Sequence, residues 1–272
     1  MKAIIVAAGR GRRLGPETAE IPKCMVKVAG QPILHRQLAA LGAAGVTEAV
    51  IVRGYLGGRI LAAREEGGNA RPTIRFVDNP DWASNNILAS LFYAEDKMEG
   101  GFVFSYSDIV FAPSVARAVV RAEHDVGLVI DRDWSAAYQG RTLHPVSEAE
   151  LARVHGGVGG GSGAEGAAAV ITRVGKQAVP PEQAAGEFIG LARFSASGAD
   201  ALRRSWQQAR RRGLDAPFGR AAALRNAYLT DALNDMADAG VRLSPVLIEG
   251  TWREIDTEQD LERAHAVVDA WS

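Results

Sequence analysis

The sequence predicts an α/β protein with a doubly wound, mostly parallel mixed sheet. Apolar runs of strand length occur at residues 3–7, 49–52 and 74–77. Segments with helical spacing of apolar residues separate them, and this alternation favours a parallel sheet. A glycine-rich loop directly follows the first run. Ligands of such sheets bind at the carboxyl ends of the strands, so we expect the functional site there.

The composition limits the class of protein. The chain has 272 residues, enough for one large α/β domain or two small ones. A net charge of -1 argues against a nucleic-acid binder, which needs a basic surface. The single cysteine, Cys24, excludes an intramolecular disulfide, and we expect it to be small and buried. Without a signal peptide or an apolar run of membrane-spanning length, we expect a cytoplasmic protein with no membrane partner. A homodimer stays open.

The first strand and its loop predict a phosphate site. Residues 3–7 read Ala-Ile-Ile-Val-Ala, which is typical of a buried parallel strand. Gly9 and Gly11 follow, and the absence of side chains lets backbone N–H groups approach a ligand. Three arginines in the loop and Lys23, which follows Pro22, supply the positive charge that a polyphosphate needs.

Two common phosphate motifs are excluded. A P-loop requires Gly-Lys followed by Ser or Thr, which is absent here. A dinucleotide fingerprint requires a third glycine where Leu14 stands. An ordinary strand-to-helix turn with solvated arginines remains as the alternative.

The remaining pattern, Ala-Ala-Gly-x-Gly-x-Arg-Leu followed by Pro-Lys, resembles the signature of nucleotidyltransferases that activate sugar phosphates, phosphocholine and phosphonates. The resemblance implies a Rossmann-like fold with a small acceptor-binding β region. It implies that Ala8, Gly9 and Gly11 surround a nucleoside triphosphate. It also implies catalytic roles for Arg13, which contacts phosphates, and for Lys23, which reaches toward the reacting phosphate.

Next come a predicted helix over 31–44, the strand at 49–52, a short helix after Leu56 and the strand at 74–77. The polar loop that follows contains Trp82, Asn85 and Asn86. It resembles the N…NN…S segment of phosphocholine and phosphonate cytidylyltransferases, which implies nucleotide binding by both asparagines. Their amides can read a pyrimidine edge, and Trp82 can stack on a base. A turn and capping cluster, with Ser84 capping the next helix, is the alternative.

A strand from residue 102 is expected to end at Asp108, which puts a carboxylate at the sheet edge. Mg²⁺ bound to a triphosphate takes one or two carboxylates. The segment Ser-Tyr-Ser-Asp-Ile-Val-Phe also resembles a block of the phosphonate-pathway cytidylyltransferases. It implies that Asp108 binds the nucleotide and its metal ion. Capping of a helix near Ser114 is the alternative.

A strand at 126–131 leads to Trp134 and Tyr138. In phosphocholine relatives, aromatic residues near this position cage a quaternary ammonium group, so both rings are candidate acceptor-binding residues. Core packing is the competing interpretation for Trp134. For the glycine-rich stretch 156–163, we prefer a mobile hairpin connection to a domain linker. His144 and His155 have no neighbour at zinc spacing, so we expect no histidine metal site.

The strand at 186–194 begins with Gly-Glu-Phe-Ile-Gly-Leu, which resembles the block that lines the acceptor side in the same families. Glu187 is therefore a candidate ligand for a cationic acceptor, or it pairs with an arginine. Basic helix 197–212 is expected to be a solvated face, and 228–239 to be another helix.

The closing block, Trp-x-Glu-Ile-Asp-Thr-x-x-Asp-Leu, resembles that of the same enzymes, where the residue matching Asp256 is a metal ligand. Glu254 and Asp256 project to the same side of an extended segment, so both can face the metal. Thr257 is expected to cap a final helix that extends to Trp271.

Together, the resemblances imply one nucleotidyltransferase domain over residues 1–272, with an acceptor-binding subregion at about 130–250. The expected reaction joins CMP from CTP to a small phosphate or phosphonate acceptor, with Mg²⁺ on Asp108 and Asp256 and release of pyrophosphate. A sugar-1-phosphate nucleotidyltransferase and a non-catalytic regulatory nucleotide-binding subunit remain as alternatives.

Overall fold

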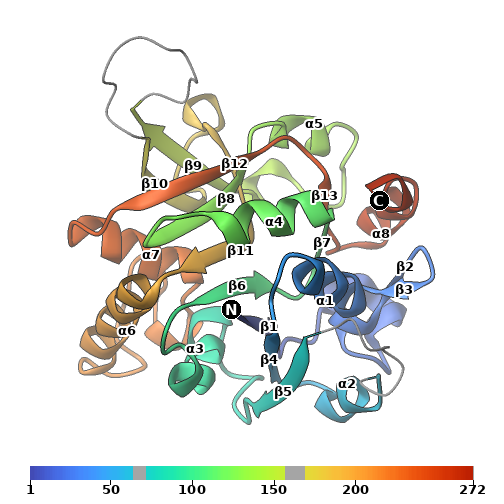
Figure 1. Ribbon diagram of the computed structural model, residues 1–272, viewed down its shortest axis with the longest axis horizontal. Helices are drawn as coiled ribbons and strands as arrows, with labels where there is room; N and C mark the ends of the chain where they lie inside the picture. The colour runs from blue at the N-terminus through green and yellow to red at the C-terminus, as the bar shows by residue number, and fades with distance from the viewer. Residues whose placement is uncertain (64–71, 157–168, 272) are drawn as a thin grey trace.

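The computed structural model describes residues 1–63, 72–156 and 169–271 (Figure 1). Within these ranges, nine strands form a mixed sheet. Its N-terminal half is parallel and has the order β6 (Phe102–Tyr106), β1 (Lys2–Ala7), β4 (Glu48–Arg53), β5 (Thr73–Asp78). The predicted doubly wound sheet is confirmed.

The other half of the sheet is organised around β11 (Gly186–Phe194), which runs antiparallel to β6. On the same edge, the start of β11 pairs with β9 (Glu150–His155), and β9 pairs with β10 (Val170–Lys176). Along its opposite edge lie β8 (Val126–Asp131) and then β12 (Leu243–Ile248). Strand β11 therefore joins the parallel half of the sheet to the region expected to bind the acceptor.

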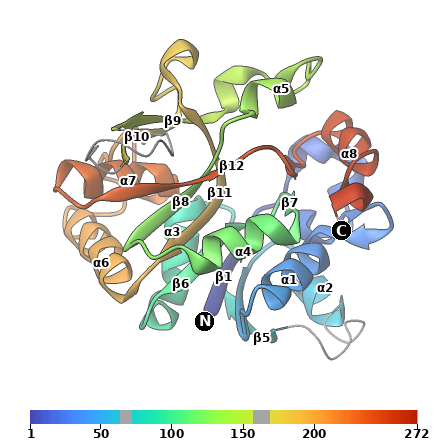
Figure 2. The ribbon, with the colours of Figure 1, turned by 45° about the horizontal axis from the view of Figure 1, so that its top comes forward.

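Helices cover both faces of the sheet (Figures 1 and 2). Ala3 and Ile5 pack with α1 (Ile33–Ala43) and α4 (Pro113–Arg121) on one face. Ile4 and Val6 point to the other face, where the covering helices are α3 (Ile87–Leu91), α6 (Ala196–Arg210) and α7 (Leu229–Asp238). Since successive strand residues face opposite sides, a strand between two helical layers must be apolar throughout, as residues 3–7 are.

The remaining elements are short. They are β2 (Lys27–Val28), β3 (Gln31–Pro32), α2 (Gly57–Ala63), β7 (Ile109–Phe111), α5 (Trp134–Tyr138), β13 (Trp252–Glu254), α8 (Glu258–His265) and 3₁₀ turns such as Arg12–Thr18 and Lys23–Met25. Helix α8 lies beside the β2–β3 hairpin, so the C-terminal segment closes over the N-terminal one (Figure 1).

Three local predictions are wrong. Ser84 does not cap α3; Asn86 does, by accepting a hydrogen bond from the N–H of Ile87 at 2.9 Å. The strand expected to reach Asp108 ends at Tyr106, and a turn separates it from β7, which pairs with β13 instead. The last helix ends at His265, with only a 3₁₀ turn, Val268–Trp271, beyond it. Thr257 does cap α8, through a reciprocal bond with Asp260.

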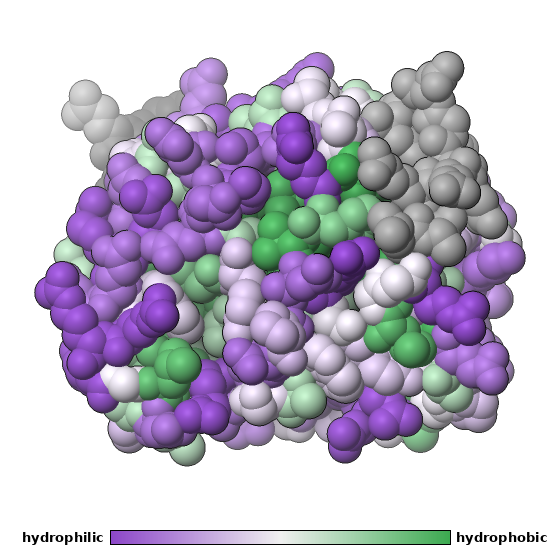
Figure 3. All heavy atoms as spheres, turned by 90° about the horizontal axis from the view of Figure 1, so that it is seen from below, coloured by the Kyte–Doolittle hydropathy of each residue, from purple (hydrophilic) through white to green (hydrophobic). Residues whose placement is uncertain are grey.

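Four further expectations concern Cys24, the glycine-rich stretch, membrane-spanning helices and the oligomeric state. Cys24 is buried, as expected. Most of the glycine-rich stretch 156–163 lies outside the described residues. Among those described, no helix is long and apolar enough to span a membrane. Hydrophilic side chains predominate on the face in Figure 3, with small hydrophobic areas between them, and a homodimer stays an untested expectation.

Candidate functional site

A cleft of about 390 Å³ lies at the carboxyl ends of β1 and β6. Its position follows from an irregularity in β11, whose pairing with β8 shifts register between Phe188 and Ala192. Gly190 lies in this stretch with φ +79°, and a Cβ there would lie 2.1 Å from the ring of Tyr106. Only glycine fits, because the backbone is left-handed and the ring takes the space of a side chain. Strand β6 thus pairs with the C-terminal end of β11, and β9 pairs with its N-terminal end. The cleft lies between β6 and β9, beside the middle of β11.

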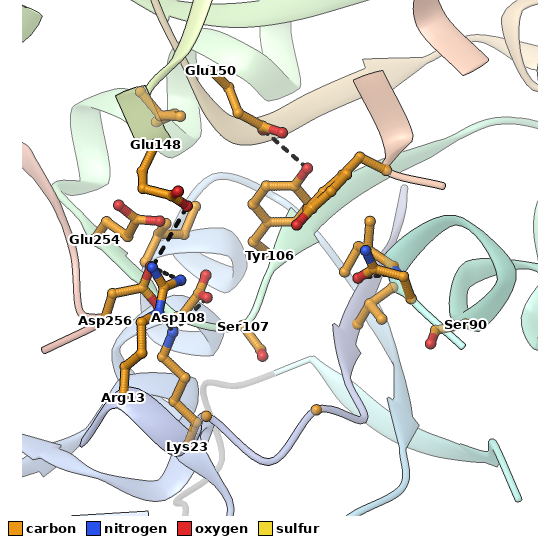
Figure 4. Close-up of a pocket in the computed structure, with 18 of the residues that line it drawn as sticks. Arg13, Lys23, Ser90, Tyr106, Ser107, Asp108, Glu148, Glu150, Glu254 and Asp256 are labelled. Carbon is orange, nitrogen blue, oxygen red and sulfur yellow. Dashed lines mark hydrogen bonds and ion pairs between the residues drawn. The ribbon is translucent and has the colours of Figure 1, made fainter. Parts of the chain in front are cut away.

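One end of the cleft holds a cluster of charged residues (Figure 4). The Nζ of Lys23 donates to Oδ2 of Asp108 at 2.7 Å and also to Oδ1 of Asp256. Arg13 donates from Nη2 to the other oxygen of Asp256 at 2.6 Å. The structure therefore brings together all four residues predicted for catalysis and metal binding, although they lie up to 243 positions apart.

The environment keeps Lys23 and Asp256 ionised. Burial opposes the charge of Lys23, but Asp108 and Asp256 together raise its pKa above the ordinary value. Burial also opposes the charge of Asp256, yet the ammonium of Lys23 and the guanidinium of Arg13 hold its pKa well below the ordinary range. The cluster is thus a set of neutralising ion pairs at neutral pH.

Local sequence explains why these groups meet. Gly11 has φ +68°, and a Cβ there would lie 2.8 Å from the side chain of Lys23. Glycine therefore lets Lys23 pass directly beneath the loop. Asp108 lies in the turn between β6 and β7. Asp256 lies just before α8, and its N–H donates to Asp260 at 3.1 Å.

The glycine loop lines the same end of the cleft. Gly9, Gly11, Arg12 and Arg13 are lining residues, whereas Ala8 is buried and is not one of them. Apart from the two adjacent residues, no atom of the described chain lies within 4 Å of the position that a Cβ on Gly9 would take, so a ligand can approach the backbone there. Among the described residues, Arg12 has no hydrogen-bond or ion-pair partner and remains available for an anion.

The opposite end of the cleft holds the two asparagines and Trp82. Asn85 and Asn79 exchange amide hydrogen bonds of 3.0 and 3.2 Å, and Ser90 donates to Asn85 Oδ1 at 3.1 Å. These bonds fix the Asn85 amide and leave one of its N–H groups unused. Asn86 has structural bonds instead, since it caps α3 and donates to the Asn226 carbonyl at 3.0 Å. Of the pair, Asn85 is the better placed to contact a ligand.

A third part of the cleft combines buried carboxylates with a lysine. Tyr106 donates to Glu150 at 3.0 Å (Figure 4), and Tyr138 donates to Glu187 at 2.7 Å. Burial raises the pKa of Glu150 to about 7 and that of Glu187 to about 8. Lys176 bonds to Glu148 at 2.9 Å and lies over the ring of Tyr228. A cationic group bound beside Glu150 and Glu187 would favour the ionised form of both carboxyls, so this part of the cleft can accept one.

The sequence did not identify four residues of this part: Glu148, Glu150, Lys176 and Tyr228. The first three lie on or next to β9 and β10, which flank the glycine-rich stretch. The sequence segment 146–150, Val-Ser-Glu-Ala-Glu, was the available signal. A carboxylate within a buried strand, as at Glu150, needs a partner or a function.

The two predicted cage residues lie away from the cleft. Neither Trp134 nor Tyr138 is one of its lining residues among those described. Their rings meet edge to face at 5.9 Å in a small apolar cluster with Leu151. The guanidinium of Arg141 lies over the ring of Tyr138 at 5.0 Å, so that ring already has a cation. The placement favours the packing alternative for Trp134, and Tyr138 reaches the cleft only through Glu187.

His144 lies beside the charged cluster. Its ring nitrogens are 3.4 Å from carboxylate oxygens of Glu254 and Asp256, and the three side chains offer ligand atoms that all lie within 4.8 Å of one another. The prediction that no histidine joins a metal site stays untested, because the arrangement shows only that these three side chains could hold an ion. It rested on neighbours along the chain, whereas the fold supplies neighbours from more than a hundred residues away. The expectation that Glu254 and Asp256 face the same side is confirmed.

We expect Glu187→Gln to flatten the pH dependence of stability. The folded-state pKa of about 8 exceeds the value of 4.5 for an ordinary glutamate, so the folded protein binds this proton more tightly. The stability gained in this way is complete below pH 4.5 and is lost as the pH rises through about 8. Glutamine keeps an oxygen for the Tyr138 hydroxyl and does not titrate. Its melting temperature should therefore fall less than that of the wild type as the pH rises from about 4.5 to about 8. Parallel curves would contradict this, and the exposed Glu182→Gln is the matched control.

Several known proteins are similar to this chain in sequence or in fold. The chain is 28% identical to the CTP:phosphoglutamine cytidylyltransferase of Campylobacter jejuni over 96% of this chain and 98% of that one. It is 32% identical to the choline-phosphate cytidylyltransferase of Streptococcus pneumoniae, over 41% of this chain and 46% of the relative. The fold also matches an inositol-1-phosphate CTP transferase from T. maritima, with a TM-score of 0.72 and 20% identity over 99% of this chain and 95% of that one.

Residues 3–217 match the family described as the MobA-like NTP transferase domain. The match includes the glycine loop, Lys23, Asp108 and strands β8 to β11, and it ends before Glu254 and Asp256. The chain therefore belongs to the MobA-like NTP transferase domain family.

Proposed function

We propose that the protein is a Mg²⁺-dependent cytidylyltransferase that joins CMP from CTP to a small phosphate or phosphonate acceptor and releases pyrophosphate. The observation that carries this proposal is the contact of Lys23 with both Asp108 and Asp256 at the glycine-loop end of the cleft. A purely regulatory nucleotide-binding subunit would not need this pair of carboxylates. The relation to cytidylyltransferases along the full chain supports the same activity.

In the proposed reaction, an acceptor oxygen attacks the α-phosphorus of CTP. A new P–O bond forms while the bond to pyrophosphate breaks, and the acceptor oxygen is already ionised at neutral pH, so no general base is required. The work of the protein is positioning and charge neutralisation. The N–H groups of Gly9 and Gly11, with Arg12 and Arg13, bind the triphosphate. Lys23 offsets charge that develops at the reacting phosphate.

Nucleotidyltransferases of this family generally use a divalent metal ion. The residues present fit Mg²⁺, because Asp108 and Asp256 already share one cation, the ammonium of Lys23. Oδ1 of Asp108 is also buried without a hydrogen-bond partner in the described chain. Asp108 and Asp256 would hold the ion, which would neutralise triphosphate charge and orient the α-phosphate.

We expect CTP to be preferred over UTP. The fixed amide of Asn85 keeps one N–H for the base edge, and Trp82 lines the same end of the cleft. Loss of a buried base-edge hydrogen bond should lower kcat/KM at least about tenfold, which corresponds to about 1.4 kcal/mol. Equal kcat/KM values for CTP and UTP with saturating acceptor would reject the preference. Asn85→Ala should reduce the preference for CTP. Asn226→Ala should leave it unchanged, because Asn226 accepts the bond from Asn86 with its backbone carbonyl, which the substitution keeps.

The acceptor is proposed to carry a cationic group that binds near Glu187 and Glu150, within the subregion of about 130–250. Oε2 of Glu187 is buried without a hydrogen-bond partner in the described chain, and both carboxylates line the cleft. Lys176 gives the same region a positive charge, which suits an acceptor that also carries a carboxylate. Phosphorylated amino acids, aminoalkyl phosphonates and phosphocholine are the acceptor classes that fit. The single-domain arrangement over residues 1–272 is proposed on the same basis, since both ends of the chain contribute to the charged cluster.

Kinetics with matched acceptors test this proposal. 2-Aminoethylphosphonate should have a lower KM than 2-hydroxyethylphosphonate with the wild type, and Glu187→Gln should remove most of the difference. A hydrogen bond to a charged group contributes about 1.5–3 kcal/mol, so the aminoethyl KM should rise at least about tenfold in the variant. The KM for CTP should stay unchanged. Equal use of both phosphonates would reject the cationic group, and a sugar phosphate as best acceptor would favour the sugar-1-phosphate alternative. Phosphoglutamine and phosphocholine are tested in the same assay, so the panel of acceptors consists of these two compounds, the two phosphonates and a sugar phosphate.

A further inference from the structure

His144 lies next to the charged cluster, and the proposed reaction gives it no role. Its side chain is 1% exposed, and neither ring nitrogen has a hydrogen-bond partner among the described residues. Buried polar side chains are almost always hydrogen-bonded, so two unpartnered nitrogens on one ring need an explanation. The ring faces Oε2 of Glu254 and Oδ2 of Asp256.

The spacing of these three side chains is close to that of a metal site. Their possible ligand atoms all lie within 4.8 Å of one another. Ligands at about 2.0–2.2 Å from a metal ion are at most about 4.4 Å apart, so small side-chain movements would complete the site. Three protein ligands also leave coordination positions open for phosphate oxygens.

The two oxygens of Asp256 face different neighbours. Oδ1 meets Lys23, which also contacts Asp108, whereas Oδ2 meets Arg13 and the His144 ring. The Arg13 side chain is 48% exposed, so it can turn into solvent and free Oδ2 for a metal ion without any nucleotide. Arg141 stays beside Glu254 because its Nε is also bonded to Asp260. Asp256 can therefore bind one cation through Oδ1 and a second cation through Oδ2.

We propose that His144, Glu254 and Asp256 bind a divalent transition-metal ion of the Mn²⁺, Co²⁺ or Zn²⁺ class. This site shares Asp256 with the proposed Mg²⁺ site and is otherwise separate from it. A nitrogen ligand makes the difference, because imidazole suits transition metals, whereas Mg²⁺ is bound mainly by oxygen. The inference does not depend on the acceptor or on turnover.

Mn²⁺ binding without nucleotide tests the proposal, with affinity measured by EPR titration. Asp108→Asn serves as the background, since it removes the other carboxylate of the proposed Mg²⁺ site. In this background one Mn²⁺ should still bind, and pulsed EPR should show nitrogen coupling from the imidazole. Adding His144→Ala should weaken that binding at least about tenfold and abolish the nitrogen coupling. His155→Ala, at an exposed histidine, should change neither.

Either of two results would overturn the proposal: unchanged Mn²⁺ affinity after His144→Ala, or bound Mn²⁺ without nitrogen coupling in the Asp108→Asn protein. Circular dichroism checks that each variant is folded. If His144→Ala does not fold, Glu254→Gln provides the same test, because it keeps an oxygen for Arg141 and removes the ligand charge. Its Mn²⁺ affinity should fall by a similar factor. Since no assay requires CTP, a failed cytidylyltransferase proposal would leave these results interpretable.

Discussion

Asp256→Asn is expected to lower kcat/KM by about 10²- to 10³-fold while the protein stays folded. Asp256 receives hydrogen bonds from both Lys23 and Arg13 and is 4% exposed, so its charge sits at the centre of the cluster. Asparagine keeps the shape and removes the charge that holds a cation beside the α-phosphate. A loss of 10²- to 10³-fold corresponds to about 3–4 kcal/mol of transition-state stabilisation, as for other groups that stabilise developing charge.

The measurement is pyrophosphate release under saturating Mg²⁺, with the best NTP and acceptor from the panel. Asp269→Asn is the matched control, because its side chain is 74% exposed and pairs with Arg36 at the surface. Its turnover should equal that of the wild type. Turnover of Asp256→Asn within a few-fold of the wild type would remove Asp256 from the reaction. A melting curve shows whether a lower rate reflects unfolding instead.

The nucleotide half of the site could be predicted from the sequence because its signals are local. A buried strand followed by a glycine loop fixes where the loop lies, and Asp108 follows β6 at the same edge of the sheet. Parallel strands in register carry residues at their carboxyl ends to one place. The closing block adds Asp256 because β13 pairs with β7 and ends beside that edge.

The acceptor half could not be predicted in the same way. Glu150 and Lys176 reach the cleft through antiparallel pairing of β9 with β10 and β11, and no local pattern specifies that register. His144 meets Glu254 only when α8 and β13 fold against the segment after α5. Trp134 and Tyr138 follow a strand, and from this position the sequence predicts that both rings lie in the cleft. The chain instead turns into α5, which packs the rings against Leu151.

The asparagine pair shows how one motif can serve two purposes. The sequence allows two interpretations of Asn85 and Asn86, base binding and a capping cluster. In the structure each interpretation fits a different one of the two residues. Asn86 is the cap of α3, whereas Asn85 is held by Asn79 and Ser90 in the cleft wall. Helix capping by an asparagine contributes about 1 kcal/mol, so Asn86→Ala should affect stability more than base choice.

Lys23→Met is expected to have the other large effect, on both rate and stability. Methionine keeps much of the apolar stem, which passes beneath Gly11, and removes the ammonium. Without it, no described side chain places a positive charge between Asp108 and Asp256, because Arg13 pairs with Asp256 and Glu148 and not with Asp108. Removing one partner of a buried ion pair costs about 3–5 kcal/mol, and the retained Arg13 contact favours the low end, about 3 kcal/mol in the free energy of unfolding.

The same variant separates the catalytic role of Lys23 from its structural one. Mg²⁺ should raise the melting temperature of Lys23→Met more than that of the wild type, because the ion replaces the missing charge between the carboxylates. Turnover should stay about 10²-fold or more below the wild type even in saturating Mg²⁺, since the ion alone does not supply the second positive charge that the ammonium adds at the reacting phosphate. Lys27→Met, at an exposed lysine four residues away, is the matched control and should change neither quantity. If Mg²⁺ restored the rate together with the stability, Lys23 would only hold the carboxylates in place, and its role at the phosphate would be wrong.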